Sequence, residues 1–240
     1  MTTYDTGAET PAEAGVILTR DLLLDDSLQR MVTRAAPGVQ WWSEAERAHS
    51  LASTLALRPL PHDGVWLFAY GSLIWNPTIH FAERRVARIR GWHRAFCLAT
   101  AAGRGTPENP GLVLGMDRGG TCTGCAFRIA EADVTAELAV LWRREMLAGS
   151  YVPRWLTVRA LDGTPFARAI AFTIDRARPS YAGALTEAET VRRLATARGA
   201  LGSGAEYLFR TRDGLRSLGL RDRTVEHLAD QVAAAQAGAA

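Results

Sequence analysis

Residues 65–77 read Val-Trp-Leu-Phe-Ala-Tyr-Gly-Ser-Leu-Ile-Trp-Asn-Pro, a continuous apolar run that ends in turn-forming residues. The run is too short to span a membrane, and its bounded ends favour a buried β-strand over residues 65–70. Gly71 allows the backbone to turn sharply and a ligand to approach it closely. Backbone N–H groups after such a turn can bind a carboxylate or an oxyanion. The stretch therefore predicts either a ligand-binding turn or, more simply, a buried strand that ends in a turn.

The middle of the chain is rich in extended segments, whereas both ends are helical in pattern. The strands predicted from apolar runs and flanking turn residues cover residues 65–70, 85–100, 112–116, 123–129, 151–160 and 166–174. Gly91 is expected to bend the long second segment, and Gly119-Gly120 is expected to form the turn between the third and fourth. Because strands mainly follow strands, the order predicts an α+β fold rather than a doubly wound parallel sheet.

Helix-start signals divide the chain into an extension, a main domain and a short tail. Capping-box patterns at Ser43/Glu46, Thr186/Glu189 and Ser203/Glu206 mark three helix starts. A further helix is expected from Asp133 to about Ala148, with Gly149 as its C-cap, and a last one over residues 223–235. The predicted boundaries are residues 1–64 for an N-terminal tail and helical extension, 65–235 for the main domain and 236–240 for a flexible tail. Residues 1–15 are expected to be disordered.

Composition and charge narrow the functional classes. The 240 residues are 48% hydrophobic and 22% charged with a net charge of +3, as in an ordinary soluble globular protein. All 28 basic residues are arginine, which excludes a Schiff-base lysine or a phosphate-binding Walker lysine. Three cysteines are too few for a disulfide framework, and residues 1–15 carry no basic residue of a signal peptide. These features predict a cytoplasmic protein with no membrane association.

Glu145 is the strongest candidate for an acid–base residue. Positions 138, 141, 142 and 145 follow helical spacing, so the Glu145 carboxylate is placed on the apolar stripe formed by leucine and tryptophan. Arg143 and Arg144 are expected on the outer face. Burial and the negative end of the helix dipole would both raise the pKa of Glu145, which suits a general base. The alternative is a partly buried glutamate neutralised by an arginine.

Three other patterns carry weaker signals. Cys122-x-x-Cys125 lacks a second ligand pair and lies in a predicted strand, so it is interpreted as packing rather than as a zinc or redox site. The arginines of residues 84–94, with Trp92 among them, could form a nucleic-acid groove, although a solvated strand face is more common. The five histidines show no metal-ligand spacing. The sequence thus predicts no metal site and no nucleic-acid partner.

Taken together, the motifs resemble those of the ChaC-type glutathione-specific γ-glutamylcyclotransferases. The resemblance covers roughly residues 65–233, with a weaker likeness over residues 16–57. It is carried by the stretches Phe68–Pro77, Gly91–Phe96, Gly103–Thr106, Trp142–Met146, Gly149–Tyr151 and Glu206–Leu208. Their order and spacing together are specific, whereas Tyr-Gly-Ser-Leu alone is not.

The resemblance implies a fold, a set of site residues and a reaction. The fold would be a mixed sheet that curls into a partial barrel with flanking helices. Glu145 would be the catalytic proton acceptor, and the residues that bind the substrate would be Ala69, Tyr70, Gly71, Ser72, Leu73, Ile74, Tyr151 and Tyr207. No cofactor would be required.

The implied reaction cleaves glutathione to 5-oxoproline and Cys-Gly by attack of the substrate's own α-amine on its γ-carbonyl, with Glu145 taking the amine proton. Two alternatives stay open: a cyclotransferase for other γ-glutamyl amides, and a non-catalytic regulatory binding protein. The sequence does not decide the oligomeric state, the role of residues 16–64 or which groups bind the Cys-Gly half.

Overall fold

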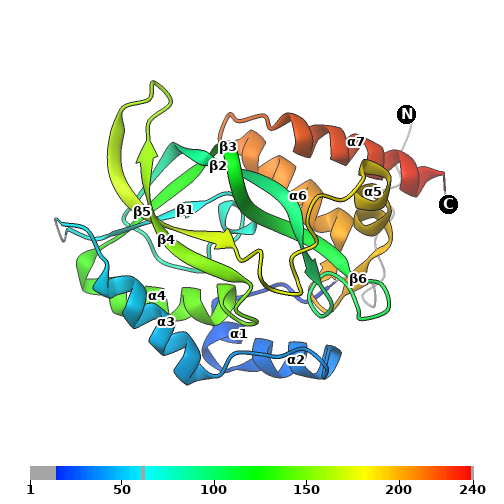
Figure 1. Cartoon of the computed structure of the whole chain (residues 1–240), viewed down its shortest axis with the longest axis horizontal. Coiled ribbons are helices and arrows are strands. Elements are labelled where there is room, and N and C mark those ends of the chain that lie inside the picture. The colour runs from blue at the N-terminus through cyan, green and yellow to red at the C-terminus, as the bar shows by residue number, and fades with distance from the viewer. Residues whose placement is uncertain (1–14, 61–62, 239–240) are drawn as a thin grey trace, which may run out of the picture.

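The computed structural model describes residues 15–60 and 63–238, and its centre is a closed five-stranded β-barrel (Figure 1). The strands are β1 (Val65–Ala69), β2 (Glu83–Thr100), β3 (Gly111–Ile129), β4 (Tyr151–Arg159) and β5 (Pro165–Ile174). Strand β3 pairs antiparallel with both β1 and β2, β4 pairs antiparallel with β5, and β1 closes the barrel by parallel pairing with β5. The sheet is therefore mixed, which confirms the predicted α+β class.

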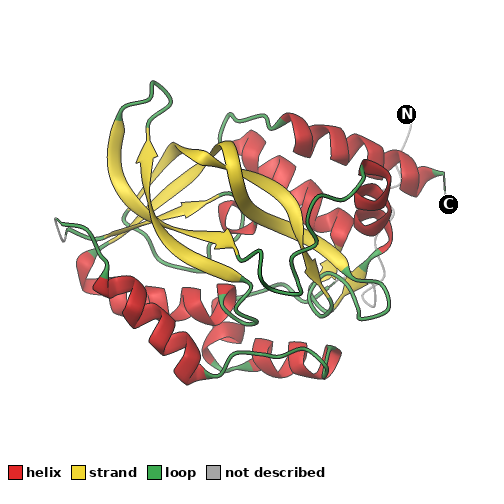
Figure 2. Ribbon diagram, in the orientation of Figure 1, coloured by secondary structure: helices red, strands yellow, loops and turns green. Residues whose placement is uncertain are grey.

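Two groups of helices flank the barrel on different sides (Figure 2). The helices are α1 (Arg20–Leu24), α2 (Ser27–Ala35), α3 (Glu44–Ala56), α4 (Val134–Glu145), α5 (Glu187–Thr196), α6 (Gly204–Ser217) and α7 (Arg223–Ala237). Short 3₁₀ turns η1 (Ser72–Ile74) and η2 (Glu131–Asp133) follow β1 and β3, and the two-residue strands β6 (Arg198–Gly199) and β7 (Gly202–Ser203) pair between α5 and α6. In both views α1–α4 lie along one side of the barrel and α5–α7 along another.

Local sequence signals account for most of these boundaries. Ser43 and Glu46 form the full reciprocal capping box at the start of α3, and the Thr186 and Ser203 side chains accept the expected hydrogen bonds at the starts of α5 and α6. The apolar run of β1 supplies Leu67 and Phe68, which point to opposite faces of the sheet and are both fully buried. Burial of this run on both faces explains why it is continuously apolar rather than alternating.

The glycine pair at positions 119 and 120 corrects one prediction. These residues do not form a hairpin turn: β3 runs unbroken from Gly111 to Ile129 and pairs with β2 along its length. The register shifts here, because Arg90 pairs with Thr121 and Trp92 pairs with Arg118. Two residues on β3 thus oppose one on β2, which is a β-bulge, and glycine tolerates the positive φ angles that the bulge requires.

Helix α4 and the chain ends also differ from their predicted limits. The helix ends at Glu145 rather than near Ala148, and Arg144, predicted on its outer face, is buried. Val140 and Leu141 precede Arg144 by four and three residues, so the same apolar face includes it. Helix α7 continues to Ala237, into the predicted tail. Residues 1–14 and 239–240 lie outside the described residues, so the disorder predicted there stays a prediction.

The segment of residues 15–42, called here the N-terminal segment, is anchored on α4 and on the residues that directly follow it. Its Arg20 pairs with the buried Glu137 of α4 at 2.6 Å. Leu28 and Val32 of α2 pack in a second apolar cluster that includes Val140 of α4. The backbone N–H of Trp42 donates to the carbonyl of Leu147 at 2.7 Å. The segment is thus a fixed part of the fold and covers the C-terminal end of α4.

Replacing Gly149 with alanine is expected to lower the free energy of unfolding. Gly149 has φ 59°, which costs an L-residue about 1–2 kcal/mol, and an added Cβ would overlap the Trp42 ring. That overlap adds about 1–3 kcal/mol of overpacking. Gly183, with φ 68° and open space around it, is the matched control. Gly183→Ala introduces the backbone strain of a positive φ angle without any steric overlap. Urea unfolding measures both, and equal losses for the two variants would contradict the Trp42 contact.

Candidate active site

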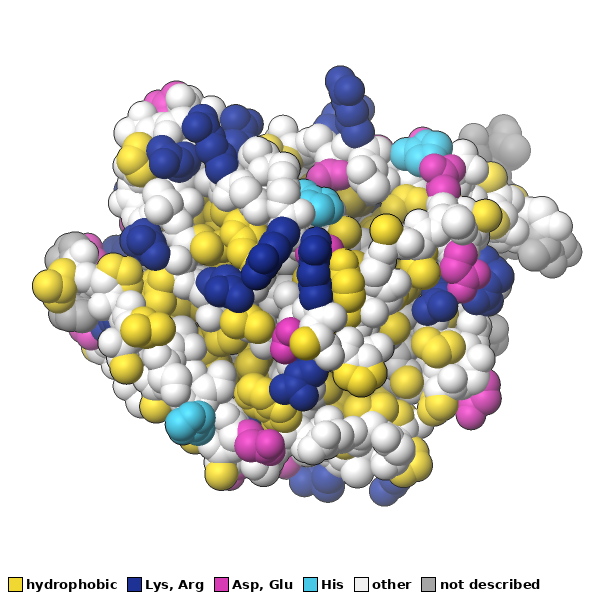
Figure 3. Space-filling view, in the orientation of Figure 1, with side chains coloured by type: hydrophobic (Ala, Val, Ile, Leu, Met, Phe, Trp, Pro, Cys, Tyr) yellow, Lys and Arg dark blue, Asp and Glu magenta, His cyan; other side chains and the backbone are white. Residues whose placement is uncertain are grey.

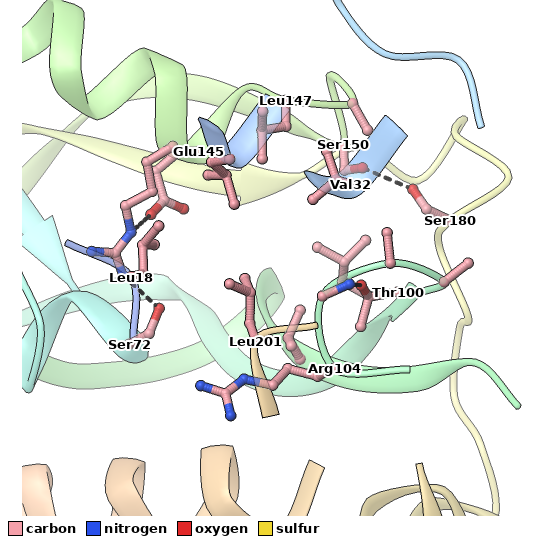
Figure 4. A pocket seen from close by; sticks show the side chains of 18 of the residues that line it. Leu18, Val32, Ser72, Thr100, Arg104, Glu145, Leu147, Ser150, Ser180 and Leu201 are labelled. Atoms are coloured by element: carbon pink, nitrogen blue, oxygen red, sulfur yellow. Dashed lines mark hydrogen bonds and ion pairs between the residues drawn. The ribbon is translucent and has the colours of Figure 1, made fainter. Parts of the chain in front are cut away.

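A cavity of about 650 Å³ lies between the barrel, α4 and the N-terminal segment (Figure 4). Its inner end meets a second hollow of about 20 Å³ at Ser72, Glu145, Tyr151 and Tyr207, which line both. The larger volume is within the usual range for a small-molecule site, and the smaller one has room for about one water. Most of the predicted site residues therefore gather at one end of a ligand-sized cavity.

The turn after β1 forms one wall of this inner end. The Tyr70 hydroxyl donates to the carbonyl of Phe172 on β5 at 2.7 Å, which fixes the start of the turn against the barrel. At Gly71, an added Cβ would lie 3.0 Å from the Tyr207 hydroxyl oxygen. Glycine thus permits the close approach of the turn to Tyr207, and the 3₁₀ turn η1 begins directly at Ser72.

Two tyrosines of the inner end share the backbone of Leu114 on β3. The Tyr151 hydroxyl donates to the Leu114 carbonyl at 3.0 Å, whereas the Leu114 N–H donates to the Tyr207 hydroxyl at 3.3 Å. Tyr207 uses its oxygen as the acceptor in that bond, so its own proton can be donated to a ligand. Burial raises the pKa of both tyrosines, so both hydroxyls keep their protons at neutral pH.

Glu145, the last residue of α4, presents its carboxylate to the cavity beside these tyrosines. Its side chain is 14% exposed, and its Oε1 lies 2.9 Å from Nε of Arg144. Burial raises the pKa of Glu145 above the ordinary value of 4.5, and the charge and hydrogen bond of Arg144 partly offset that rise. The carboxylate is therefore held close to the turn in a state that can exchange a proton.

Arg144 connects the carboxylate to the turn. Its guanidinium donates to Ser72 Oγ at 2.9 Å and to Thr78 Oγ1 at 3.1 Å, and it also binds the carbonyl of Asn76. Figure 4 shows Glu145 and Ser72 close together at one side of the cavity. One arginine thus bridges α4 and residues 72–78, so the turn and the carboxylate keep a fixed relation. The prediction that Arg144 lies on the outer face of α4 concealed this bridging role. Its spacing of three residues from Leu141 was the signal that it shares the apolar face.

A second polar group lines the cavity beyond Tyr207. Arg104 pairs with Glu206 at 2.6 Å, and its guanidinium lies over the Tyr207 ring, 5.9 Å from the centroid. Arg210 pairs with the same Glu206 at 3.0 Å. Two arginines thus share one glutamate, which leaves positive charge available to an anion at this side of the cavity.

The predicted site residues divide into two groups by position. Those that line one or both hollows are Tyr70, Gly71, Ser72, Leu73, Glu145, Tyr151 and Tyr207. Ala69 is fully buried in β1 and Ile74 packs near Gly214 of α6, and neither lines these two hollows. Sequence reasoning placed Arg144 on the outer face of α4 and did not find the contribution of the N-terminal segment, because helix-start signals do not reveal where an extension docks.

The other sequence patterns lie away from the cavity. Cys122 and Cys125 are free and buried in β3, and no group of three His, Cys, Asp or Glu side chains within the described ranges could hold a metal ion.

Of the arginine run, Arg94 is buried beside Asp222, whereas Arg85 is paired with Glu83 on the surface. On the face in Figure 3, the basic side chains form several small groups with hydrophobic side chains between the groups. Among residues 15–60 and 63–238, no helix has both the length and the apolar character to cross a bilayer.

Comparison with known proteins identifies the class of this fold and site. The family model of ChaC-like proteins matches residues 65–235. A glutathione-specific γ-glutamylcyclotransferase of Escherichia coli (strain K12) is 42% identical over 207 residues, which cover 86% of this chain and 88% of that protein. Glutathione-specific γ-glutamylcyclotransferase 1 of Homo sapiens is 31% identical over 169 residues, covering 69% of this chain and 75% of the human protein.

The solved structures agree in fold. A crystal structure of a γ-glutamylcyclotransferase specific to glutathione from yeast aligns with a TM-score of 0.64 at 19% identity, covering 72% of this chain and 99% of that chain. The chain has a γ-glutamylcyclotransferase fold, and it belongs to the ChaC-like family. The matched family range begins at Val65, so the N-terminal segment that lines the cavity lies outside that range.

Replacing Arg144 with glutamine is expected to raise the pKa of Glu145. The substitution removes the cation whose charge and hydrogen bond offset the effect of burial on the Glu145 carboxyl. Carbon-13 NMR titration of the Glu145 carboxyl measures the change. Arg143→Gln is the matched control, because Arg143 pairs with Asp26 and Glu44 on the surface. An unchanged or lowered Glu145 pKa in Arg144→Gln would contradict the assigned pairing.

Proposed function

We propose that this protein is a γ-glutamylcyclotransferase that cleaves glutathione to 5-oxoproline and Cys-Gly. The observation that carries the proposal is the largely buried Glu145 carboxylate, held by Arg144 against the Tyr70–Leu73 turn at the inner end of a ligand-sized cavity. The relatives named above are called glutathione-specific γ-glutamylcyclotransferases, which supports the substrate assignment. A purely binding protein does not require an ionisable carboxylate at this position.

The charges around the cavity complement those of glutathione. The substrate carries two carboxylates and one ammonium group at neutral pH, so it is a net anion. The charged residues that line the cavity are Arg104, Arg144, Arg178, Arg210, Glu145 and Glu206. The arginines outnumber the glutamates, so the potential favours the two carboxylates, while Glu145 is the nearest partner for the ammonium at the inner end.

Glu145 acts as the general base in the proposed reaction. The α-ammonium of the substrate donates its proton to the Glu145 carboxylate, and the free amine then attacks the γ-carbonyl carbon. A five-membered lactam closes while the amide C–N bond to cysteine breaks, and Glu145 returns the proton to the departing amine. The ring nitrogen then loses its second proton to the regenerated Glu145 carboxylate, which releases it to solvent or to the product amine. The raised pKa of Glu145 brings its basicity closer to the range in which proton transfer at neutral pH is efficient.

The turn and Tyr207 act on the γ-carbonyl. Backbone N–H groups of the Tyr70–Leu73 turn, with the Tyr207 hydroxyl, are placed to stabilise the oxyanion or to hold the α-carboxylate. One such donor typically contributes about 2.7–4 kcal/mol to transition-state stabilisation. Folding the γ-glutamyl chain back on itself in a near-attack geometry can contribute roughly 7–11 kcal/mol. Ring closure is an intramolecular acyl transfer, so the reaction needs no electron acceptor and no covalent enzyme intermediate.

The remaining assignments follow from the same site. We assign substrate contact to the hollow-lining residues Tyr70, Gly71, Ser72, Leu73, Tyr151 and Tyr207, with Ala69 and Ile74 as the residues that pack behind the turn. The main domain is residues 65–235, and residues 1–64 are its extension. The three cysteines are free and buried, which suits a reducing compartment and supports a cytoplasmic location.

An endpoint assay tests the substrate class. The purified protein is incubated with reduced glutathione, with γ-glutamyl-alanine and with buffer, and 5-oxoproline and Cys-Gly are measured by mass spectrometry. We expect equimolar 5-oxoproline and Cys-Gly from glutathione and little product from the dipeptide. Turnover of the dipeptide alone would move the substrate class to other γ-glutamyl amides. A folded protein without product from either compound would favour the non-catalytic binding protein.

Substituting Glu145 with glutamine is expected to lower kcat by about 10²–10⁴-fold, because the amide cannot accept the ammonium proton. Glutamine keeps the size of the side chain, so circular dichroism should show an unchanged fold. Glu187→Gln, at an exposed glutamate of α5, is the control and should keep full turnover. Unchanged turnover of Glu145→Gln would disprove its role as the base.

A further inference from the structure

The outer half of the cavity is built largely by the N-terminal segment. Residues that this segment contributes to the lining include Leu18, Leu28, Val32, Val39 and Trp41, and none of its lining residues is charged. Val16 and Ile17 also line the cavity and are 42% and 63% exposed, so large apolar side chains stand at its edge. The segment therefore provides an apolar wall that the barrel alone would not have.

The facing wall is apolar as well. It is formed by Ala101, Ala102, Leu147 and Leu201, and Figure 4 shows Leu201 across the cavity from Val32. Two polar pairs here are satisfied within the protein: the Ser150 and Ser180 hydroxyls lie 3.0 Å apart, and Thr100 Oγ1 accepts from the N–H of Gly103 at 3.3 Å. The Trp41 Nε1–H is buried and has no hydrogen-bond partner in the protein. We call this part of the cavity, between the N-terminal segment and these residues, the apolar chamber.

The chamber is fixed before any ligand enters. The Val16 N–H donates to the carbonyl of Ala200 at 3.0 Å, and the Asn76 side chain donates to the carbonyl of Leu18 at 2.8 Å. The Trp42 N–H is bonded to Leu147, as described above. Hydrogen bonds at both ends of the segment thus hold the wall in place, and a preformed apolar wall binds an apolar group with little ordering cost.

The proposed reaction directs the substrate's cysteine side chain towards this chamber. The γ-carbonyl must lie at the inner end beside Glu145, where the adjoining hollow of about 20 Å³ has room only for about one water. The cysteine is bonded directly to that carbonyl through its amide, so it has to extend into the larger cavity. The carboxylate of the substrate's Cys-Gly half has Arg104 and Arg210 of the cavity lining as partners. The sulfur is left facing the apolar walls.

We propose that this enzyme also cleaves glutathione S-conjugates, in which an apolar substituent on the sulfur occupies the apolar chamber. The proposal rests on the proposed function and extends its substrate class. The step is unchanged: the α-nitrogen bonds to the γ-carbon, the amide C–N bond breaks, and the proton passes through Glu145 to the departing amine. The thioether takes no part, so the products are 5-oxoproline and S-substituted Cys-Gly and no co-reactant is needed.

The wild-type enzyme tests the proposal with glutathione and its S-methyl, S-butyl and S-hexyl derivatives. We expect turnover of all four, with KM falling by at least about tenfold from the S-methyl to the S-hexyl compound as the chain fills the chamber. Turnover of glutathione with no turnover of the conjugates, or KM rising with chain length, would overturn this inference and leave the proposed function intact. Absence of turnover with glutathione and with every conjugate would overturn both.

A pair of variants locates the substituent. Ile17→Asn places a polar group at the edge of the chamber, and Leu24→Asn makes the same change at an exposed leucine of α1 that does not line the cavity. The ratio of kcat/KM for S-hexylglutathione to that for glutathione should fall severalfold in Ile17→Asn and stay unchanged in Leu24→Asn. Both side chains are exposed, so both variants should fold. Equal ratios in the two variants would place the substituent outside the chamber.

Discussion

A largely buried carboxylate, that of Glu145, beside a buried arginine organises the whole site. Arg144 is the residue through which helix α4 holds residues 72–78, and the same guanidinium pairs with Glu145. Removing one member of such a pair leaves the other charge uncompensated in a poorly solvated place. The resulting loss of folding free energy is larger than the net stability that the intact pair contributes. The turn, the base and the end of α4 therefore depend on one another, and the surrounding barrel serves to hold them together.

The pairing also balances two opposing demands on Glu145. Full burial without a cation would keep the carboxyl protonated at neutral pH, and full exposure would leave it a weak base. Arg144 offsets part of the burial effect, so the pKa of Glu145 is raised less than burial alone would raise it. The carboxylate also remains accessible from the cavity that it lines. The tyrosines around it keep their protons because burial raises the pKa of each. The Tyr207 hydroxyl can therefore donate to the substrate while the Glu145 carboxylate accepts a proton from its ammonium group.

Much of the fold could be read from local pattern, because strand and helix signals act over a few residues. The apolar run of β1, the capping box at Ser43 and the placement of Glu145 on the apolar face of α4 needed no tertiary information. The Gly119-Gly120 pair was misread, because a bulge and a turn demand the same backbone freedom. The docking of residues 15–42 on the cavity could not be predicted, because it depends on contacts such as Arg20 with Glu137, which are far apart in sequence.

The central claim is that the α-amino group of glutathione binds at Glu145. A crystal structure of the Glu145→Gln protein with glutathione measures it most directly, since this variant should retain uncleaved substrate. We expect the α-nitrogen within about 2.6–3.2 Å of the side chain at position 145, the γ-carbonyl oxygen on the Tyr70–Leu73 turn and the sulfur towards Val32. A γ-glutamyl group bound instead at the Ser150–Ser180 end, away from position 145, would contradict the account.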